Sequence, residues 1–270
     1  MKYIYVNIST NMQTVTQSIL IGLLQGLLEW LPVSSEGNMV LVLVALFGLS
    51  AEETVSIAIF LHLGTGFAAL IYFREEVIKI LVGETPEYAD LRAKLFVMTL
   101  LTGLVGFPIF MWLNISVAYG EILLALTGLA LIITGLLQRE AEKKIQNGAE
   151  LSWPLSIILG AAQGLAIIPG LSRSGLTTSI MLFRDFTGED AFRISFLMSI
   201  PASFAAAFGL ILVDGFTPDP YAALSALIAG IVGYLAIDAL LRVARRISFW
   251  KICVGLGALA VIAWLPTLLV

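Results

Sequence analysis

The sequence is short of charged side chains. Only 13% of its 270 residues are Asp, Glu, Lys or Arg, whereas 59% are hydrophobic and the mean hydropathy is +0.97. Soluble domains carry about twice that charged fraction. The composition therefore excludes an ordinary soluble domain and predicts a polytopic membrane protein with most of its mass in the bilayer.

Cysteine and clustered basic residues are also scarce. The single cysteine, Cys253, excludes an internal disulfide and a zinc cluster. The net charge is −4 and the basic residues are scattered, so we expect no nucleic-acid partner. The first residues lack the charged region, the apolar region and the cleavage site of a secretory signal. Insertion is therefore expected to depend on the first hydrophobic segments.

Six apolar segments are long enough to cross a bilayer, which takes about 20 helical residues. They are 54–73, 95–112, 118–137, 191–213, 221–241 and 249–268. Two further apolar regions are interrupted. Residues 14–31 are stopped by Pro32, and the next run, 38–49, is too short to cross. Residues 152–168 and 175–183 repeat this pattern around a Pro-Gly pair, so each region predicts a re-entrant hairpin.

The two interruptions resemble each other in sequence. LQGLLEWLPVSSEG begins at residue 24 and AQGLAIIPGLSRSG begins at residue 162. At this offset of 138 residues, identical residues coincide: Gln25 with Gln163, Gly26 with Gly164, Leu27 with Leu165, Ser34 with Ser172 and Gly37 with Gly175. We therefore predict a single all-α membrane domain, 1–270, with internal repeats at approximately 14–137 and 152–268.

The repeats are expected to be inverted in the membrane. Three predicted spans separate the hairpins, and an odd number makes the second hairpin enter from the opposite face, so that both turns meet near the midplane. All the Lys and Arg residues except Lys2 and Arg173 lie in four loops on one side: 74–94, 138–151, 184–193 and 242–251. Because cytoplasmic loops are enriched in Lys and Arg, this side is expected to be cytoplasmic.

Glu29 and Arg173 place opposite charges inside the two predicted hairpins. Gln25 and Glu29 are four residues apart and share one helix face. A carboxylate at that depth costs about 2.5–3.5 kcal/mol on insertion scales, and Arg173 in the other hairpin is its expected counterpart. The two charges are either a structural ion pair or the centre of a functional site.

Small polar residues flank both turns. They are Ser34, Ser35 and Gly37 at the first turn, and Ser172, Ser174 and Gly175 at the second. Serine is a favoured N-cap, and free N–H groups at the start of a helix bind anions. Glycine allows close backbone approach. The pattern is compatible with ordinary capping and with a cradle for phosphate.

These stretches resemble a known family. Q-x-x-x-E-x-x-P-V-S-S at 25–35 and P-G-x-S-R-S-G-x-T at 169–177 are similar to the two signature regions of the undecaprenyl-pyrophosphate phosphatase family, also called the bacitracin-resistance family. The likeness continues at 196–201 (FLMSIP) and 246–249 (RISF) and spans nearly the whole chain.

The resemblance implies a multi-pass enzyme of the plasma membrane with ten helices, including two re-entrant pairs. It would remove the terminal phosphate of a polyprenyl pyrophosphate and so recycle the lipid carrier for cell-surface polymers. The resemblance also implies a pocket toward the outer face and dependence on a divalent cation, Mg²⁺ or Ca²⁺.

The motif residues divide into three expected roles. Glu29, Ser35 and Arg173 are predicted to be catalytic. Substrate contacts are predicted for Gln25, Ser34, Gly37, Asn38, Ser172, Ser174, Gly175 and Thr177. Glu29 and Glu36 are the predicted metal ligands, with a solvated carboxylate at the rim of the site as the alternative for Glu36. Ser35 is the expected nucleophile with Glu29 as its base, and a water activated by Glu29 is the alternative.

One residue departs from the family pattern. The family's histidine falls on Asn38, which can hydrogen-bond a phosphate oxygen but cannot shuttle a proton near neutral pH. The single histidine, His62, lies about halfway along 54–73 and is either a packing residue or the proton donor to the leaving phosphate.

The missing motif histidine keeps a second function open. Inverted repeats with broken helices are typical of transporters, so a non-hydrolytic transporter or flippase of a polyprenyl phosphate lipid is the alternative. The sequence does not determine the oligomeric state, and a homodimer is compatible with it.

Overall fold

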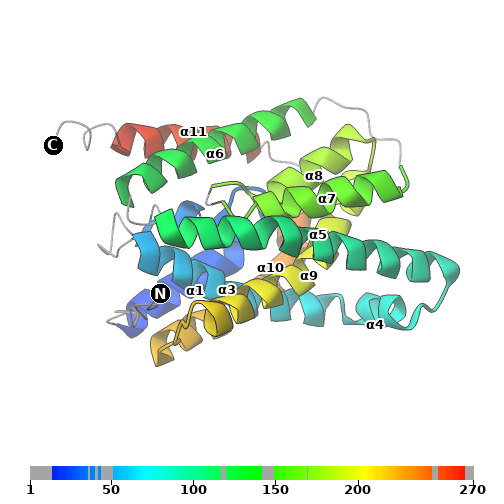
Figure 1. The fold of residues 1–270 in the computed structure, drawn as a ribbon, viewed down its shortest axis with the longest axis horizontal. Helices are drawn as coiled ribbons and strands as arrows, with labels where there is room; N and C mark the ends of the chain where they lie inside the picture. The colour runs from blue at the N-terminus through cyan, green and yellow to red at the C-terminus, as the bar shows by residue number, and fades with distance from the viewer. Residues whose placement is uncertain are drawn as a thin grey trace.

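The computed structural model describes residues 14–35, 37–39, 42–43, 51–116, 120–141, 149–168, 170–244 and 249–264. The regular elements in this part of the chain are α-helices, as predicted (Figure 1). They are α1 (Val15–Leu28), α3 (Ala51–Tyr72), α4 (Arg74–Val82), α5 (Pro86–Ser116), α6 (Gly120–Ala141), α7 (Trp153–Leu165), α8 (Arg173–Phe183), α9 (Gly188–Val213), α10 (Pro220–Ala244) and α11 (Phe249–Trp264).

Among the described residues, four helices are long and apolar enough to cross a membrane. These candidate spans are Glu53–Tyr72, Pro86–Trp112, Gly188–Val213 and Pro220–Ala239. They match four of the six predicted spans, in α3, α5, α9 and α10. The other two predictions, 118–137 and 249–268, fall on α6 and α11. Shorter apolar helices are Val15–Leu28, Trp153–Leu165 and Trp250–Ile262.

The segment 74–94, expected to be a loop, is mostly helical. It holds α4 and the first turns of α5, which begins at Pro86 rather than at residue 95. Proline is favoured at the first position of a helix, and Glu87 complements the dipole there. Apolar residues of this segment pack against a buried core cluster: Val77, Tyr88 and Leu91. A polar composition indicated a loop, but an amphipathic helix has the same composition.

Helices α1 and α7 begin and end in the same way. The hydroxyl oxygen of Thr14 caps α1 by accepting a hydrogen bond from the backbone N–H three residues later. Ser152, which lies 138 residues after Thr14, caps α7 in the same way. α1 ends shortly before Pro32, which has no N–H to continue a helix. α7 ends shortly before Gly170, whose φ of +95° suits glycine. The predicted interruptions are therefore confirmed in both places.

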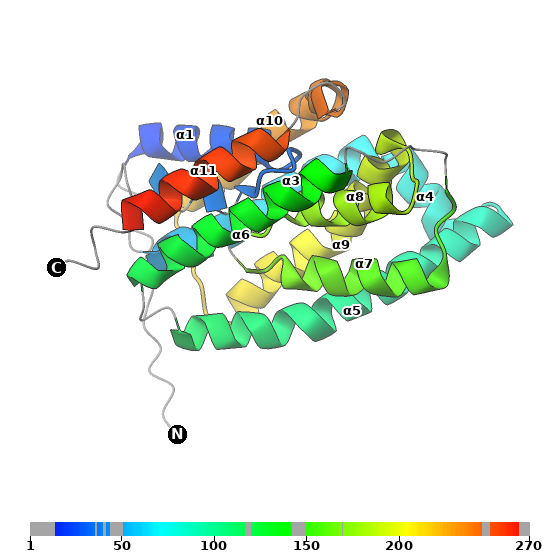
Figure 2. The same ribbon diagram turned by 90° about the horizontal axis from the view of Figure 1, so that it is seen from above.

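The helices also pack in corresponding pairs. α1 packs against α10 and α7 against α5, at opposite edges of the molecule in Figure 2. α3 packs against α9, and α6 against α11. At each edge, two glycines four residues apart face backbone carbonyls of the partner helix: Gly22 and Gly26 in α1, and Gly160 and Gly164 in α7. Small residues at this spacing let membrane helices approach closely.

The tightest glycine contact among the described residues joins α3 to α10. A Cβ at Gly64 would lie 1.9 Å from the carbonyl oxygen of Ala226. We expect Gly64→Ala to force the helices apart and to lower the free energy of unfolding by about 1–3 kcal/mol, measured as earlier thermal unfolding in detergent. Gly255→Ala in α11 is the matched control, because a Cβ there meets no atom within 4 Å. Equal unfolding temperatures for the two variants would contradict this expectation.

Candidate active site

The site lies where the two interrupted regions meet. We call residues 29–34 the first turn and residues 166–172 the second turn. Ser174 donates from Oγ to the carbonyl oxygen of Leu31 at 3.0 Å. A Cβ at Gly37 would lie 3.1 Å from the Cα of Gly170, so the backbones of the two regions nearly touch. The sequence separates these regions by more than a hundred residues, and the fold brings them into direct contact.

Helices α6 and α11 hold the two turns in place. Gln138 Nε2 and Cys253 Sγ both donate to the carbonyl oxygen of Pro32, the latter at 3.2 Å. Thr134 in α6 accepts the backbone N–H of Ser172 at 3.4 Å. On the other side, Trp30 is buried, and its indole nitrogen donates to the carbonyl oxygen of Gly233 in α10 at 3.0 Å. The contacts to Pro32 and Ser172 pair backbone groups that have no helical partner where a helix is interrupted.

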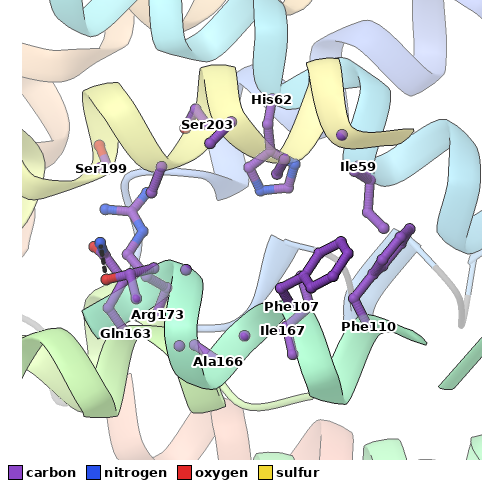
Figure 3. A pocket seen from close by; sticks show the side chains of 18 of the residues that line it. Ile59, His62, Phe107, Phe110, Gln163, Ala166, Ile167, Arg173, Ser199 and Ser203 are labelled. Carbon is purple, nitrogen blue, oxygen red and sulfur yellow. Dashed lines mark hydrogen bonds between the residues drawn. The ribbon is translucent and has the colours of Figure 1, made fainter. Parts of the chain in front are cut away.

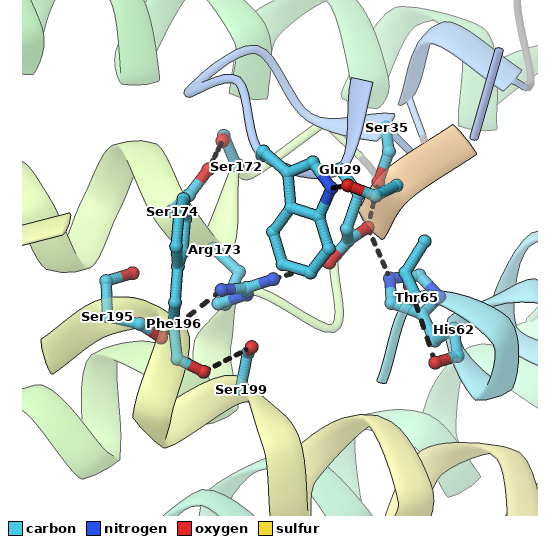
Figure 4. Close-up of polar contacts among 12 residues, drawn as sticks. Glu29, Ser35, His62, Thr65, Ser172, Arg173, Ser174, Ser195, Phe196 and Ser199 are labelled. Atoms are coloured by element: carbon cyan, nitrogen blue, oxygen red, sulfur yellow. Dashed lines mark hydrogen bonds and ion pairs between the residues drawn. The ribbon is translucent and has the colours of Figure 1, made fainter. Parts of the chain in front are cut away.

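Glu29 is the centre of the site (Figure 4). Its side chain is only 3% exposed. Oε1 accepts a hydrogen bond from Nη2 of Arg173, which is the first residue of α8. Oε2 accepts from Ser35 Oγ at 2.8 Å and from Gln25 Nε2 at 3.0 Å. His62 Nε2 in α3 lies 3.3 Å from the same oxygen. Four segments of the chain thus converge on one buried carboxylate.

The ion pair of Glu29 and Arg173 neutralises both charges where desolvation is costly. Arg173 also donates from Nη1 to the carbonyl oxygen of Ser195 in α9 at 3.3 Å. A guanidinium has five N–H donors, so these two contacts leave donors for phosphate oxygens. Arg173 lies at the start of α8, where the positive end of the helix dipole also favours an anion.

The ring of His62 is oriented by its own helix. Nδ1 lies 2.7 Å from the carbonyl oxygen of Ala58. Because a carbonyl oxygen can only accept, Nδ1 carries a proton, and Nε2 is the nitrogen that faces Glu29. The sequence allows two roles for His62, as a packing residue or as a proton donor. The structure brings it to the predicted catalytic carboxylate.

The serines of the two turns occupy equivalent capping positions. Ser34 Oγ accepts the N–H of Gly37 at 3.2 Å, and Ser172 Oγ accepts the N–H of Gly175 at 3.1 Å. Ser34 has a φ of 49°, which is uncommon for a residue with a side chain. Capping is therefore one role of both serines. Both also line the cavity described next, so capping does not remove them from the site.

A small polar cavity adjoins these residues. It has a volume of about 20 Å³, which is room for about one water molecule. Its polar lining is Glu29, Ser34, Ser35, His62, Ser172, Arg173 and Ser174. Six of the predicted site residues, together with His62, therefore share one enclosure.

A larger cavity continues from it, and we call it the apolar cavity. Its volume is about 230 Å³, and it shares His62, Ala166 and Arg173 with the polar cavity. Figure 3 shows Arg173 and Gln163 toward one end and Phe107 and Phe110 toward the other. The two cavities together offer a charged end and a long apolar end.

The structure gives four other predicted contact residues different surroundings. Asn38 Nδ2 donates to the carbonyl oxygens of Val33 and Ser34, at 2.5 and 2.8 Å, and so secures the first turn. Thr177 Oγ1 bonds to the backbone of Arg173 at 2.8 Å. Gly37 and Gly175 pack against neighbouring elements. Neither cavity is lined by any of these four. Glu36 lies outside the described residues.

Gln163 lines the apolar cavity but is not among the site residues predicted from the sequence. It is 4% exposed. Its Nε2 donates to Thr102 Oγ1 at 3.0 Å, and its Oε1 is buried with no hydrogen-bond partner among the described residues. The signal was present, because Gln163 is the repeat counterpart of Gln25.

The fold and the site define a helical membrane protein with a buried Ser–Glu–Arg–His cluster. Comparison with known proteins gives the family: residues 18–260 match the model of the bacitracin resistance protein BacA family, and the chain belongs to this family. It is 40% identical over 263 residues to "Undecaprenyl-diphosphatase" of Methanococcoides burtonii, covering 93% of this chain and 98% of the relative. It is 43% identical over 273 residues to the protein of the same name from Haloarcula marismortui, covering 94% and 98%.

Proposed function

We propose that this protein is an integral membrane phosphatase that converts a polyprenyl diphosphate of the undecaprenyl type to the monophosphate and inorganic phosphate. One observation carries the proposal: Ser35 Oγ donates to Glu29 Oε2 at 2.8 Å, beside Arg173 and His62. A hydroxyl, a base and an anion-binding cation in contact are the parts that phosphoryl transfer requires. The names of the full-length relatives support the same activity.

The proposed architecture has six spans and two re-entrant hairpins, arranged as inverted repeats over approximately 14–137 and 152–268 within one domain. Three observations support it. The capping residues Thr14 and Ser152 correspond, the glycine pairs of α1 and α7 correspond, and the packing of α1 on α10 corresponds to that of α7 on α5.

The proposed orientation places the basic loops in the cytoplasm and the catalytic pocket toward the outer face of the plasma membrane. The distribution of Lys and Arg supports the first part. The apolar cavity supports the second, because it extends along α5 and α9 to Phe110 and Leu210, close to the helix ends away from the basic loops.

The proposed reaction begins at Ser35. Its hydroxyl proton passes to Glu29 Oε2, and Oγ attacks the terminal phosphorus in line with the leaving oxygen. Arg173 holds the phosphoryl oxygens. The P–O bond to the polyprenyl monophosphate breaks, and the leaving oxygen takes the proton of the Ser35 hydroxyl, which Glu29 passes on through His62 Nε2. Glu29 is then a carboxylate again. Water attacks the phosphoserine, its proton passes to Glu29 and from there to the departing Ser35 Oγ, and phosphate is released.

A divalent cation remains an expectation from the family resemblance. Among the residues described, no group of three His, Cys, Asp or Glu side chains could hold a metal. Mg²⁺ is commonly held by one or two carboxylates plus substrate phosphates, and Glu29 with a diphosphate fits that pattern. Glu29 and the substrate oxygens would hold the ion, which would supply neutralising positive charge when bound.

Phosphate release from purified protein in detergent tests the proposed activity. We expect inorganic phosphate to appear from undecaprenyl diphosphate when Mg²⁺ or Ca²⁺ is present. A transporter without hydrolytic activity needs two compartments and releases none. Absence of phosphate with both cations, from protein that remains folded, would overturn the proposed function and favour lipid transport.

Replacing Ser35 separates the two routes of attack. If Ser35 is the nucleophile, Ser35→Ala lowers kcat by at least about 10³-fold, as expected when a covalent nucleophile is removed. The wild-type enzyme should also incorporate ³²P from terminally labelled substrate after an acid quench. Activity of Ser35→Ala within about tenfold of wild type, with no labelled protein, would instead support a water activated by Glu29.

A further inference from the structure

The apolar cavity opens between α5 and α9. Most of its lining comes from one face of each helix, between residues 99 and 110 of α5 and between residues 199 and 210 of α9, and the rest comes from α3, α7, α8 and the second turn. We call this region the α5–α9 seam. Two of its glycines, Gly103 and Gly209, have open space around them, because a Cβ at either would meet no atom of the described part of the chain within 4 Å. Small residues therefore leave this seam empty rather than bringing the helices together.

Large apolar side chains border the seam on the membrane side. Phe107, which lines the cavity, is 52% exposed, and further large apolar residues in or next to the same stretches of α5 and α9 are exposed as well: Leu104, Phe208 and Leu212. At the inner end of the cavity lie His62, Arg173 and Gln163. The seam thus runs from the catalytic cluster to surfaces that would face lipid.

The equivalent interface in the other half of the molecule is closed. α3 corresponds to α9 and α10 to α5, and there the helices meet at Gly64. A Cβ at Gly64 would lie 1.9 Å from Ala226 and 3.1 Å from the backbone of Gly230. A groove of about 560 Å³ follows the outside of this pair, but its walls include no residue of the polar cavity. Only one of these two related interfaces therefore reaches the catalytic residues.

We infer that the prenyl chain of the substrate enters through the α5–α9 seam and lies there during the reaction, with the diphosphate at Arg173 and His62. The inference rests on the proposed function and adds the route and position of the lipid tail. Its occupant follows from continuity: the cavity that begins at the phosphate site becomes apolar and ends at lipid. A chain in this position keeps its apolar surface out of water while its charged end meets Arg173.

Filling the seam tests this inference. Gly209→Leu places a side chain in open space, and leucine favours a helix more than glycine does. We expect kcat/KM for undecaprenyl diphosphate to fall by about 10- to 100-fold. For dimethylallyl diphosphate, whose five-carbon tail needs little of the seam, we expect a change of less than about threefold. Gly103→Leu fills the seam from the opposite wall and should act in the same way.

Gly255→Leu in α11 is the matched control, because that glycine also has open space around it but lies outside both cavities. It should leave both activities unchanged. Normal hydrolysis of undecaprenyl diphosphate by Gly209→Leu and Gly103→Leu would overturn the seam. Equal losses on the long and short substrates would also overturn it, because they would indicate a distorted catalytic site. Failure of the wild type on both substrates would instead reject the proposed function.

Discussion

Glu29→Gln is expected to lower kcat by about 10²- to 10⁴-fold, the range for losing a general base. The amide has nearly the shape of the carboxylate, so the cavity keeps its size. The amide cannot take the proton of Ser35. It also no longer neutralises the positive charge of Arg173, which contacts Oε1 of the native carboxylate. Measurement of phosphate release at saturating substrate, over a range of pH, checks the result. The low rate should persist at high pH, because an amide does not titrate as a base.

The buried position of Glu29 requires a control for folding. Removing one member of a buried ion pair costs about 3–5 kcal/mol, so unfolding temperature and elution volume in detergent must be measured for the variant. Asp238→Asn makes the same chemical change at an exposed position on α10 where the carboxylate contacts Tyr72, away from the site. Near-normal activity of Glu29→Gln would reject Glu29 as the base. Equal losses in both variants would attribute the effect to stability.

Arg173→Ala is expected to lower kcat/KM by about 10³-fold or more, since cationic stabilisation of a phosphoryl transition state is worth about 10³–10⁵. The variant also leaves Glu29 buried without its cationic partner. Arg173→Lys separates charge from geometry. Lysine restores a positive charge but not the planar fork that holds Glu29 and the phosphate together. We therefore expect Arg173→Lys to recover folding more fully than activity.

Arg193→Ala provides the comparison for Arg173→Ala. Arg193 also forms an ion pair with a glutamate, Glu76, with Nε 2.7 Å from the carboxylate, but it lines neither cavity. Its loss should reduce stability with little change in kcat. Activity surviving in both Glu29→Gln and Arg173→Ala would remove the proposed site altogether. In the double variant the losses should be smaller than additive, because the two residues act as one unit.

Much of the site could be predicted because its signals are local. The proline and polar residues inside apolar runs predicted broken helices, and the structure confirms that α1 and α7 end before Pro32 and Gly170. The contact of Glu29 with Arg173 could also be anticipated, since an isolated charge at that depth needs a partner. Both predictions used only the cost of placing a group in a membrane.

Other features could not be predicted, because they depend on orientation and packing. Asn38 occupies a motif position, yet its amide faces the carbonyls of its own turn. The sequence cannot indicate this, because the direction of that side chain depends on how the backbone folds back at the first turn, where Ser34 has a φ of 49°. Gln163 shares its repeat position with Gln25, yet the neighbours that α5 and α9 supply give it a different role.

The sequence by itself determined the lipid environment of this protein and the places where its helices break. Both follow from individual residues, because burial in lipid penalises each charged side chain and each unpaired backbone group. The tertiary structure decided which polar groups meet and which helix interfaces close. His62 reaches Glu29 only through the packing of α3 beside the first turn, and glycine closes one interface while it leaves the related one open. Both outcomes depend on distances between segments remote in the chain, which no local pattern encodes.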